Sequence, residues 1–231
     1  MNESSDGPGD DASEPFSPVE RPVRLAQKAY DEIRFALLSG GDITDGRFSE
    51  DDLAKALSVS RTPVRDALHR LAMVGLIEAA HPGGYSRRRT TIRGVNEHCE
   101  LRLLLEPRAA ARAAVLDADV RAELIAGLRA NLKPENPVEE AEFHRAIAAA
   151  SNDGSLPSLI GDLSDLAGLD EVWLEGSSTG NGLPRPDHDE IVSALEQGDP
   201  EAAERAMSRH IESVRRRLTE LLAQLPAKVG A

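Results

Sequence analysis

The chain has 231 residues, of which 40% are hydrophobic, 29% are charged and only 3% are aromatic, and its formal net charge at pH 7 is -13. This length suits one small and one medium domain, and the shortage of aromatic residues favours a core of packed helices built from Leu, Ala, Ile and Val. A single cysteine, Cys99, excludes an intramolecular disulfide, and no stretch resembles a signal peptide or an 18-residue membrane span, so we expect a soluble cytoplasmic protein.

The N-terminal segment predicts a tail followed by two helices. Residues 1–20 combine Ser, Asp, Gly and Pro with few apolar side chains, which predicts a disordered acidic tail. Apolar residues recur at helical spacing over 25–38, and a Gly-Gly pair follows, so a first helix should end there. Ser49 then begins SEDD, in which an aspartate three residues after the serine predicts the capped start of a second helix.

A third helix and a hairpin complete the first domain. Pro63 falls in the first turn of this helix, where its missing N–H has no intrahelical acceptor to lose, and Gly75 ends it. Residues 76–92 read as a short strand, a His-Pro-Gly-Gly turn and a second strand. Three helices followed by a hairpin predict a winged helix-turn-helix over residues 21–93.

Beyond residue 93 the pattern is helical throughout. Asp199 before Pro200 is a favourable N-cap and first-turn pair for the last helix. The predicted fold class is therefore mainly α, with an all-α helical bundle over residues 94–231. The helices are expected at 95–116, 118–132, 137–151, 155–175, 186–197 and 200–225.

The start of the third helix, VSRTPVRD, has the chemistry of a DNA-reading element. Arg61 and Arg65 are four residues apart and share a face, while hydroxyl groups beside them suit phosphate oxygens. Residues 21–94 carry 13 Lys and Arg against nine Asp and Glu, whereas the rest of the chain carries 14 against 31. The alternative is that the arginines only solvate a surface helix, but the preceding helix, the tight turn and the wing favour DNA binding.

The run from Ala29 to Gly84, which contains LAKALSVSRTPVRDALHRLAMVGLI, resembles the N-terminal domain of GntR-family bacterial transcription regulators. The chain departs from the family at Asp51, where relatives can carry a DNA-contacting arginine. The second wing strand holds three consecutive arginines, 87–89, which either contact phosphate or lie on a solvated edge strand. The resemblance implies DNA contacts by Ser60, Arg61, Thr62 and Arg65, and by the wing tip at His81, Gly83 and Gly84.

The second domain contains a histidine pattern that can hold a metal ion. Glu140 and His144 are four residues apart on one helical face, and His188 and His210 belong to two further helices. These groups can converge inside a bundle around a divalent ion. Scattered histidines also lie commonly at surfaces or as hydrogen-bonded core residues, so spacing alone leaves both interpretations open.

The segments around His144, His188 and His210 resemble the FCD ligand-binding domain of the FadR subgroup of the same family. The stretch ELRLLLEPRAA and the Asn152 that follows AAAS belong to the same resemblance. The resemblance implies a divalent metal, often zinc or nickel, whose open positions accept a carboxylate effector. It also implies that Arg102 faces this cavity and, with Asn152, contacts the effector; for Arg102 the alternative is an ion pair with Glu106 one turn on. The implied metal ligands are Glu140, in place of the family's Asp, and His144, His188 and His210.

The leading hypothesis is a ligand-responsive repressor. A homodimer would present two winged domains to a two-fold symmetric operator in double-stranded DNA, and a small organic acid bound in the metal-containing pocket would change their spacing. No membrane partner is expected. The alternatives are a metal-dependent enzyme acting on a small carboxylate and a DNA-binding protein without an effector.

Overall fold

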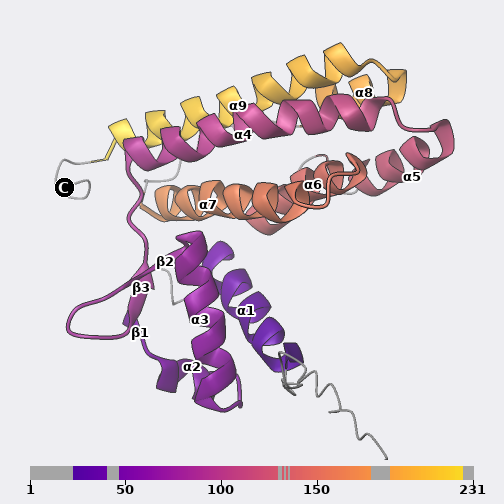
Figure 1. Ribbon diagram of the computed structural model, residues 1–231. Helices are drawn as coiled ribbons and strands as arrows, with labels where there is room; N and C mark the ends of the chain where they lie inside the picture. The colour runs from indigo at the N-terminus through magenta and orange to yellow at the C-terminus, as the bar shows by residue number, and fades with distance from the viewer. Residues whose placement is uncertain are drawn as a thin grey trace, which may run out of the picture.

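The computed structural model of the chain describes residues 23–40, 47–129, 132, 134, 136–177 and 188–225. The predicted tail over residues 1–20 lies outside this range. The described chain consists of a winged unit and a helical unit that stack on each other (Figure 1). None of the described helices is both long and apolar enough to cross a membrane.

The winged unit contains three helices and a three-stranded antiparallel sheet of order β1-β3-β2. The wing is therefore larger than the predicted hairpin, because a two-residue strand before the second helix pairs with β3. Its core is built from fully buried aliphatic side chains such as Leu37, Leu68 and Leu71. In chain order the elements are α1 (Val23–Leu38), β1 (Arg47–Phe48), α2 (Glu50–Ala56), α3 (Arg61–Val74), β2 (Ile77–Ala79) and β3 (Tyr85–Arg87).

Local sequence signals account for the boundaries of these elements. The hydroxyl of Ser49 accepts a hydrogen bond from the backbone N–H of Asp52 at 3.2 Å, so the predicted cap of α2 is confirmed. Gly75 ends α3 with φ of 87°, a left-handed conformation that favours glycine. Gly84 has φ of +81°, and a side chain there would meet the carbonyl oxygen of Phe48 at 2.7 Å, so glycine is required where the wing approaches β1.

The helical unit is an all-α bundle, as predicted. Helices α4 and α9 run antiparallel along one side, and α6 and α7 form the layer between them and the winged unit (Figure 1). The predicted spans differ mainly at α5, which ends at Leu128, and at α8, which begins at Asp189. The helices are α4 (Ile92–Ala114), α5 (Ala118–Leu128), α6 (Pro137–Ala150), α7 (Leu156–Ser177), α8 (Asp189–Gln197) and α9 (Pro200–Ala223).

Helix α7 joins the two units. Leu169 is fully buried in the core of the winged unit, although it belongs to the helical bundle. The guanidinium of Arg34 on α1 forms a bidentate pair with the buried carboxylate of Asp165, at 2.5 and 2.6 Å. Five residues further on, Asp170 accepts hydrogen bonds from Arg88 and Thr90, each at 2.7 Å. The winged unit is therefore held by buried charged and apolar contacts to one face of α7.

Candidate functional site

The residues expected to read DNA lie together at the N-terminus of α3. Ser60, Arg61, Thr62 and Arg65 are all exposed. Ser60 is the N-cap residue by its backbone, but its side chain makes no capping hydrogen bond. The hydroxyl is therefore not engaged by its own helix and remains available to a phosphate oxygen.

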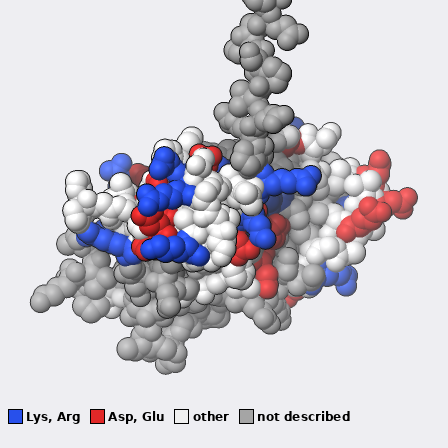
Figure 2. Space-filling view, turned by 90° about the horizontal axis from the view of Figure 1, so that it is seen from below, with Lys and Arg blue, Asp and Glu red and all other residues white. Residues whose placement is uncertain are grey.

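Both arginines are paired with acidic residues from the first turn of α2. Arg61 forms an ion pair with Asp51, and Arg65 contacts both carboxylate oxygens of Glu50 at 2.9 to 3.1 Å. The hydrogen bond from Arg65 lowers the pKa of the Glu50 carboxyl. On the described part of this face, basic and acidic side chains are interleaved and do not form a continuous basic surface (Figure 2). Exposed ion pairs of this kind contribute at most about 1 kcal/mol, so DNA can displace them.

The remaining candidate DNA contacts lie in the wing, some at the tip of the hairpin and the others in its second strand. His81 and Gly83 are exposed at the hairpin tip, whereas Gly84 is explained by its close approach to Phe48. In the second strand, the guanidinium of Arg87 lies 4.9 Å from the ring centroid of Trp173. With Arg88 paired to Asp170, these two arginines contact α7, an arrangement that the sequence interpretation did not consider.

The structure brings the four expected metal ligands together inside the helical unit. Their ligand atoms all lie within 4.8 Å of one another. The Nε2 atoms of His144 and His210 are each 3.1 Å from the same oxygen of Glu140 and 3.2 Å from each other. His188, at the N-cap of α8, places its Nε2 atom 3.3 Å from the second oxygen of Glu140.

This cluster can hold either a divalent cation or shared protons. The Nδ1 atom of His144 lies 2.5 Å from a Glu106 oxygen. Burial would lower the pKa of His144, but Glu106 outweighs burial and raises it. A protonated His144 donates to both carboxylates, and a bound divalent ion would take the place of the proton on Nε2. Burial lowers the pKa of His210 to about 4, which keeps this ring in the neutral, metal-binding form.

The Glu140 carboxyl is held in its charged form. Burial alone would raise its pKa, but hydrogen bonds from the three histidines outweigh burial and hold the pKa well below its usual value. An ionised carboxylate with three imidazoles is a donor set that suits a divalent first-row transition metal. The structure thus contains a cluster that can hold such an ion.

Arg102 forms the ion pair with Glu106 that the sequence left as an alternative, and it also lines a cavity beside the cluster. Its Nε atom donates to a Glu106 oxygen at 2.5 Å, while its two terminal nitrogens are fully buried and have no hydrogen-bond partner within the described chain. Burial would raise the pKa of Glu106, but Arg102 and His144 lower it to about 2. Glu106 therefore links the arginine to a candidate metal ligand, a role that the sequence analysis did not assign.

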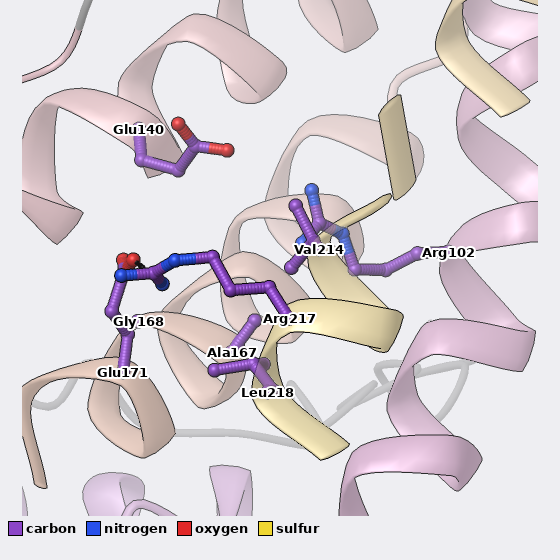
Figure 3. A pocket seen from close by; sticks show the side chains of 8 residues that line it. All are labelled: Arg102, Glu140, Ala167, Gly168, Glu171, Val214, Arg217 and Leu218. Atoms are coloured by element: carbon purple, nitrogen blue, oxygen red, sulfur yellow. Dashed lines mark hydrogen bonds and ion pairs between the residues drawn. The ribbon is translucent and has the colours of Figure 1, made fainter. Parts of the chain in front are cut away.

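A cavity of about 20 Å³ adjoins the cluster, which is room for about one water molecule. Figure 3 shows Arg102 approaching it from α4 and Arg217 extending from α9 to Glu171 on α7. Arg217 was not predicted, although it lies seven residues after His210 and so on the same side of α9. The lining residues are Arg102, Glu140, Ala167, Gly168, Glu171, Val214, Arg217 and Leu218.

Asn152 does not join this site. It is exposed in the turn after α6 and is not among the residues that line the cavity. Its φ of 57° is left-handed, a conformation that asparagine tolerates better than most residues. The turn gives a structural reason for this asparagine, and its effector contact stays a prediction.

Comparison with known proteins gives similarity over both units. Residues 25–86 match the model of the bacterial regulatory proteins of the gntR family, and residues 97–213 match the FCD domain.

The chain is 29% identical over 199 residues to a probable D-xylose utilization operon transcriptional repressor of Paenarthrobacter nicotinovorans, covering 81% of this chain and 85% of that protein. It is also 29% identical over 201 residues to the Uxu operon transcriptional regulator of Escherichia coli (strain K12), covering 74% of this chain and 77% of that protein. The solved structure of E. coli McbR/YncC is similar in fold, with a TM-score of 0.69 at 24% identity over 86% of this chain and 98% of that chain.

Proposed function

Because the chain belongs to the gntR family of bacterial regulatory proteins and carries an FCD domain, we propose that it is a repressor that a small organic acid releases from DNA. Its function as a DNA-binding transcription regulator follows from this membership. Repression is supported by the relative named as a transcriptional repressor of a D-xylose operon. Residues 21–93 would form the DNA-binding domain, and residues 94–231 the effector-binding and dimerisation domain.

In the DNA complex, the exposed residues at the start of α3 would enter the major groove. Ser60 and Thr62 would bind phosphate, and Arg61 and Arg65 would exchange their carboxylate partners for DNA. A bidentate arginine contact distinguishes guanine from the other bases. The wing tip at His81 and Gly83 would approach the minor groove.

Effector binding is supported by the two buried terminal nitrogens of Arg102, which lie beside the metal-ligand cluster and have no hydrogen-bond partner among the described residues. Burying a guanidinium without partners is costly, and a carboxylate in the cavity would satisfy both nitrogens. Glu140, His144, His188 and His210 would hold zinc or nickel. The bound ion would supply positive charge at the carboxylate-binding end of the cavity.

Helix α7 is the proposed connection between effector and DNA. Its Ala167 and Glu171 line the cavity, while Asp165 and Asp170 hold the winged unit. The cavity has room for about one water molecule, so an organic acid must displace its lining. A shift of α7 would then move α3, the recognition helix that carries the DNA-contacting residues. If the acid changes the affinity for DNA by some factor, thermodynamic linkage requires DNA to change the affinity for the acid by the same factor.

The proposed homodimer is supported by an apolar stripe on α4. Leu101 and Leu104 lie three residues apart and are 48% and 72% exposed. Covering both in a two-fold interface would place two recognition helices against the two half-sites of a symmetric operator. An enzymatic role is not proposed, because the matched families and named relatives are regulators.

The test is the response of operator-bound protein to acids. An operator would be selected from random duplex DNA with the full-length protein, and mono-, di- and hydroxycarboxylates would be titrated by fluorescence anisotropy. Wild type, Arg102→Ala and His144→Ala should bind DNA alike, but only wild type should respond to the effector. An acid that acts on all three proteins with the same midpoint and amplitude would contradict the assigned pocket.

A further inference from the structure

The two acidic residues that pair with the recognition helix differ in how fully their arginine partners engage them. Glu50 accepts hydrogen bonds from Arg65 through both carboxylate oxygens, and its side chain is 26% exposed. Asp51 contacts the Nε atom of Arg61 through one oxygen, and its side chain is 45% exposed. Among the described residues, neither Asp51 nor Arg61 forms another hydrogen bond or ion pair. Asp51 is therefore the more open of the two acids to a molecule that approaches the start of α3.

DNA binding by Arg61 changes the surroundings of Asp51. The aspartate side chain is short and lies against Arg61 in the free protein, so it stays beside the DNA after the arginine has turned to a base. Phosphate oxygens repel a carboxylate there, and it loses hydration unless it finds a hydrogen-bond donor. In the major groove, the donors that DNA offers are the amino groups of cytosine and adenine. The released carboxylate is thus favourable only beside one of these two bases.

Cytosine suits a carboxylate better than adenine does. Its major-groove edge presents the N4 amino group, whereas adenine presents the N7 acceptor directly beside its own amino group. Guanine and thymine present acceptors there without an amino group, so both repel a carboxylate. Arginine has the opposite preference, because it donates to O6 and N7 of guanine. Arg61 and Asp51 therefore suit the two complementary bases, guanine and cytosine.

We propose that Asp51 is a specificity-determining residue, which accepts a hydrogen bond from the N4 amino group of a cytosine in the same base pair as the guanine bound by Arg61 or in the adjacent one. This inference rests on the proposed placement of the start of α3 in the major groove. It makes α2 a second element that reads sequence. It also gives a use to an acidic side chain on a face where acidic and basic side chains are interleaved (Figure 2).

The experiment compares the base preferences of the full-length protein and its variants. Duplexes bound by each protein would be selected from a random library and sequenced. Dissociation constants for the four base pairs at the affected position would then be measured by fluorescence anisotropy. The variants are Asp51→Ala, Asp51→Asn and Arg61→Ala. The matched control is Asp31→Asn on the exposed side of α1, which removes the same charge from the same unit.

Wild type should bind a site with cytosine at this position about ten-fold more tightly than the same site with guanine there. Asp51→Ala should lose this preference. Asp51→Asn should change it from cytosine to adenine, because an amide pairs with both N6 and N7 of adenine. Arg61→Ala should relax the preference for guanine in the same or the adjacent base pair, and Asp31→Asn should change no preference. A switch of the preferred base at one position does not arise from a general loss of stability or of negative charge.

Asp51 variants that bind every duplex more tightly, with no change of the preferred base, would overturn the inference, because the carboxylate would then act only as a charge. Variants with a lower melting temperature and unchanged base preferences would also overturn it, since Asp51 would then serve only the first turn of α2. If Arg61→Ala leaves the base preferences unchanged as well, the proposed placement of the start of α3 is itself wrong. The failure of that placement is thereby distinguishable from the failure of base reading by Asp51.

Discussion

Glu106→Gln isolates the contribution of the carboxylate that links Arg102 to the metal-ligand cluster. Glutamine keeps the size of the side chain but removes its charge, and it presents an amide where the Nδ1 proton of His144 now meets an oxygen at 2.5 Å. The lost carboxylate would no longer fix the tautomer and orientation of His144, so metal affinity should fall about 10- to 100-fold. This corresponds to about 1.4 to 2.8 kcal/mol.

The same substitution should destabilise the protein. It leaves the buried guanidinium of Arg102 without its anionic partner, and breaking a buried ion pair from one side typically costs about 3–5 kcal/mol. For a chain of 150–250 residues each kcal/mol lowers the melting temperature by about 2–4 °C, so a fall of roughly 6 °C or more is expected.

The assay is competition for zinc between the protein and a chromophoric chelator, with thermal melts followed by circular dichroism. Glu100→Gln, on the exposed side of the same helix, is the matched control and should behave as wild type. A folded Glu106→Gln protein that binds zinc with wild-type affinity would refute the linking role of Glu106.

Three further substitutions test other parts of the structure. Arg65→Ala should weaken operator binding by about 1–3 kcal/mol and relax specificity at one position of each half-site, whereas Arg87→Ala, which removes a contact with Trp173, should leave sequence preference unchanged in competition assays. Burial and nearby guanidinium groups lower the pKa of His98 to about 3. Between pH 6.5 and 3 the unfolded chain therefore binds more protons than the folded one, so the free energy of unfolding falls as the pH drops through this window. His98→Gln should remove about 2 kcal/mol of that loss at pH 5, measured by urea unfolding. Leu104→Glu should convert the proposed dimer to a monomer in light scattering, and an unchanged molar mass would exclude α4 from the interface.

Much of the fold could be predicted because its signals are local. The caps at Ser49 and Asp199 are both formed by the expected side chains, and helical periodicity located every helix of the bundle. Strand β1 was missed because two residues carry no periodicity. The predicted boundaries were wrong at the end of α5 and at the start of α8. Both boundaries lie beside loops, where the periodic sequence pattern fades.

The site was predicted less completely, because its connections are between residues distant in sequence. The i, i+4 pair of Glu140 and His144 was readable, but nothing local shows that Glu106 bonds to His144, 38 residues away. Likewise, the docking of Arg88 on Asp170 depends on a stacking of two units that periodicity does not encode. For Asn152, to which the family resemblance gave a binding role, the left-handed backbone conformation supplies a structural reason for the residue, and the effector contact stays a prediction.

Footprinting can show whether an acid-sensing metal pocket controls sequence-specific DNA binding by this protein. Full-length protein loaded with zinc would be bound to an operator selected from random duplexes, with and without the acid that binds it most tightly. We expect a discrete, two-fold symmetric protected site whose occupancy falls when the acid is added. Uniform protection along the DNA, or a discrete footprint that the bound acid leaves unchanged, would contradict this expectation.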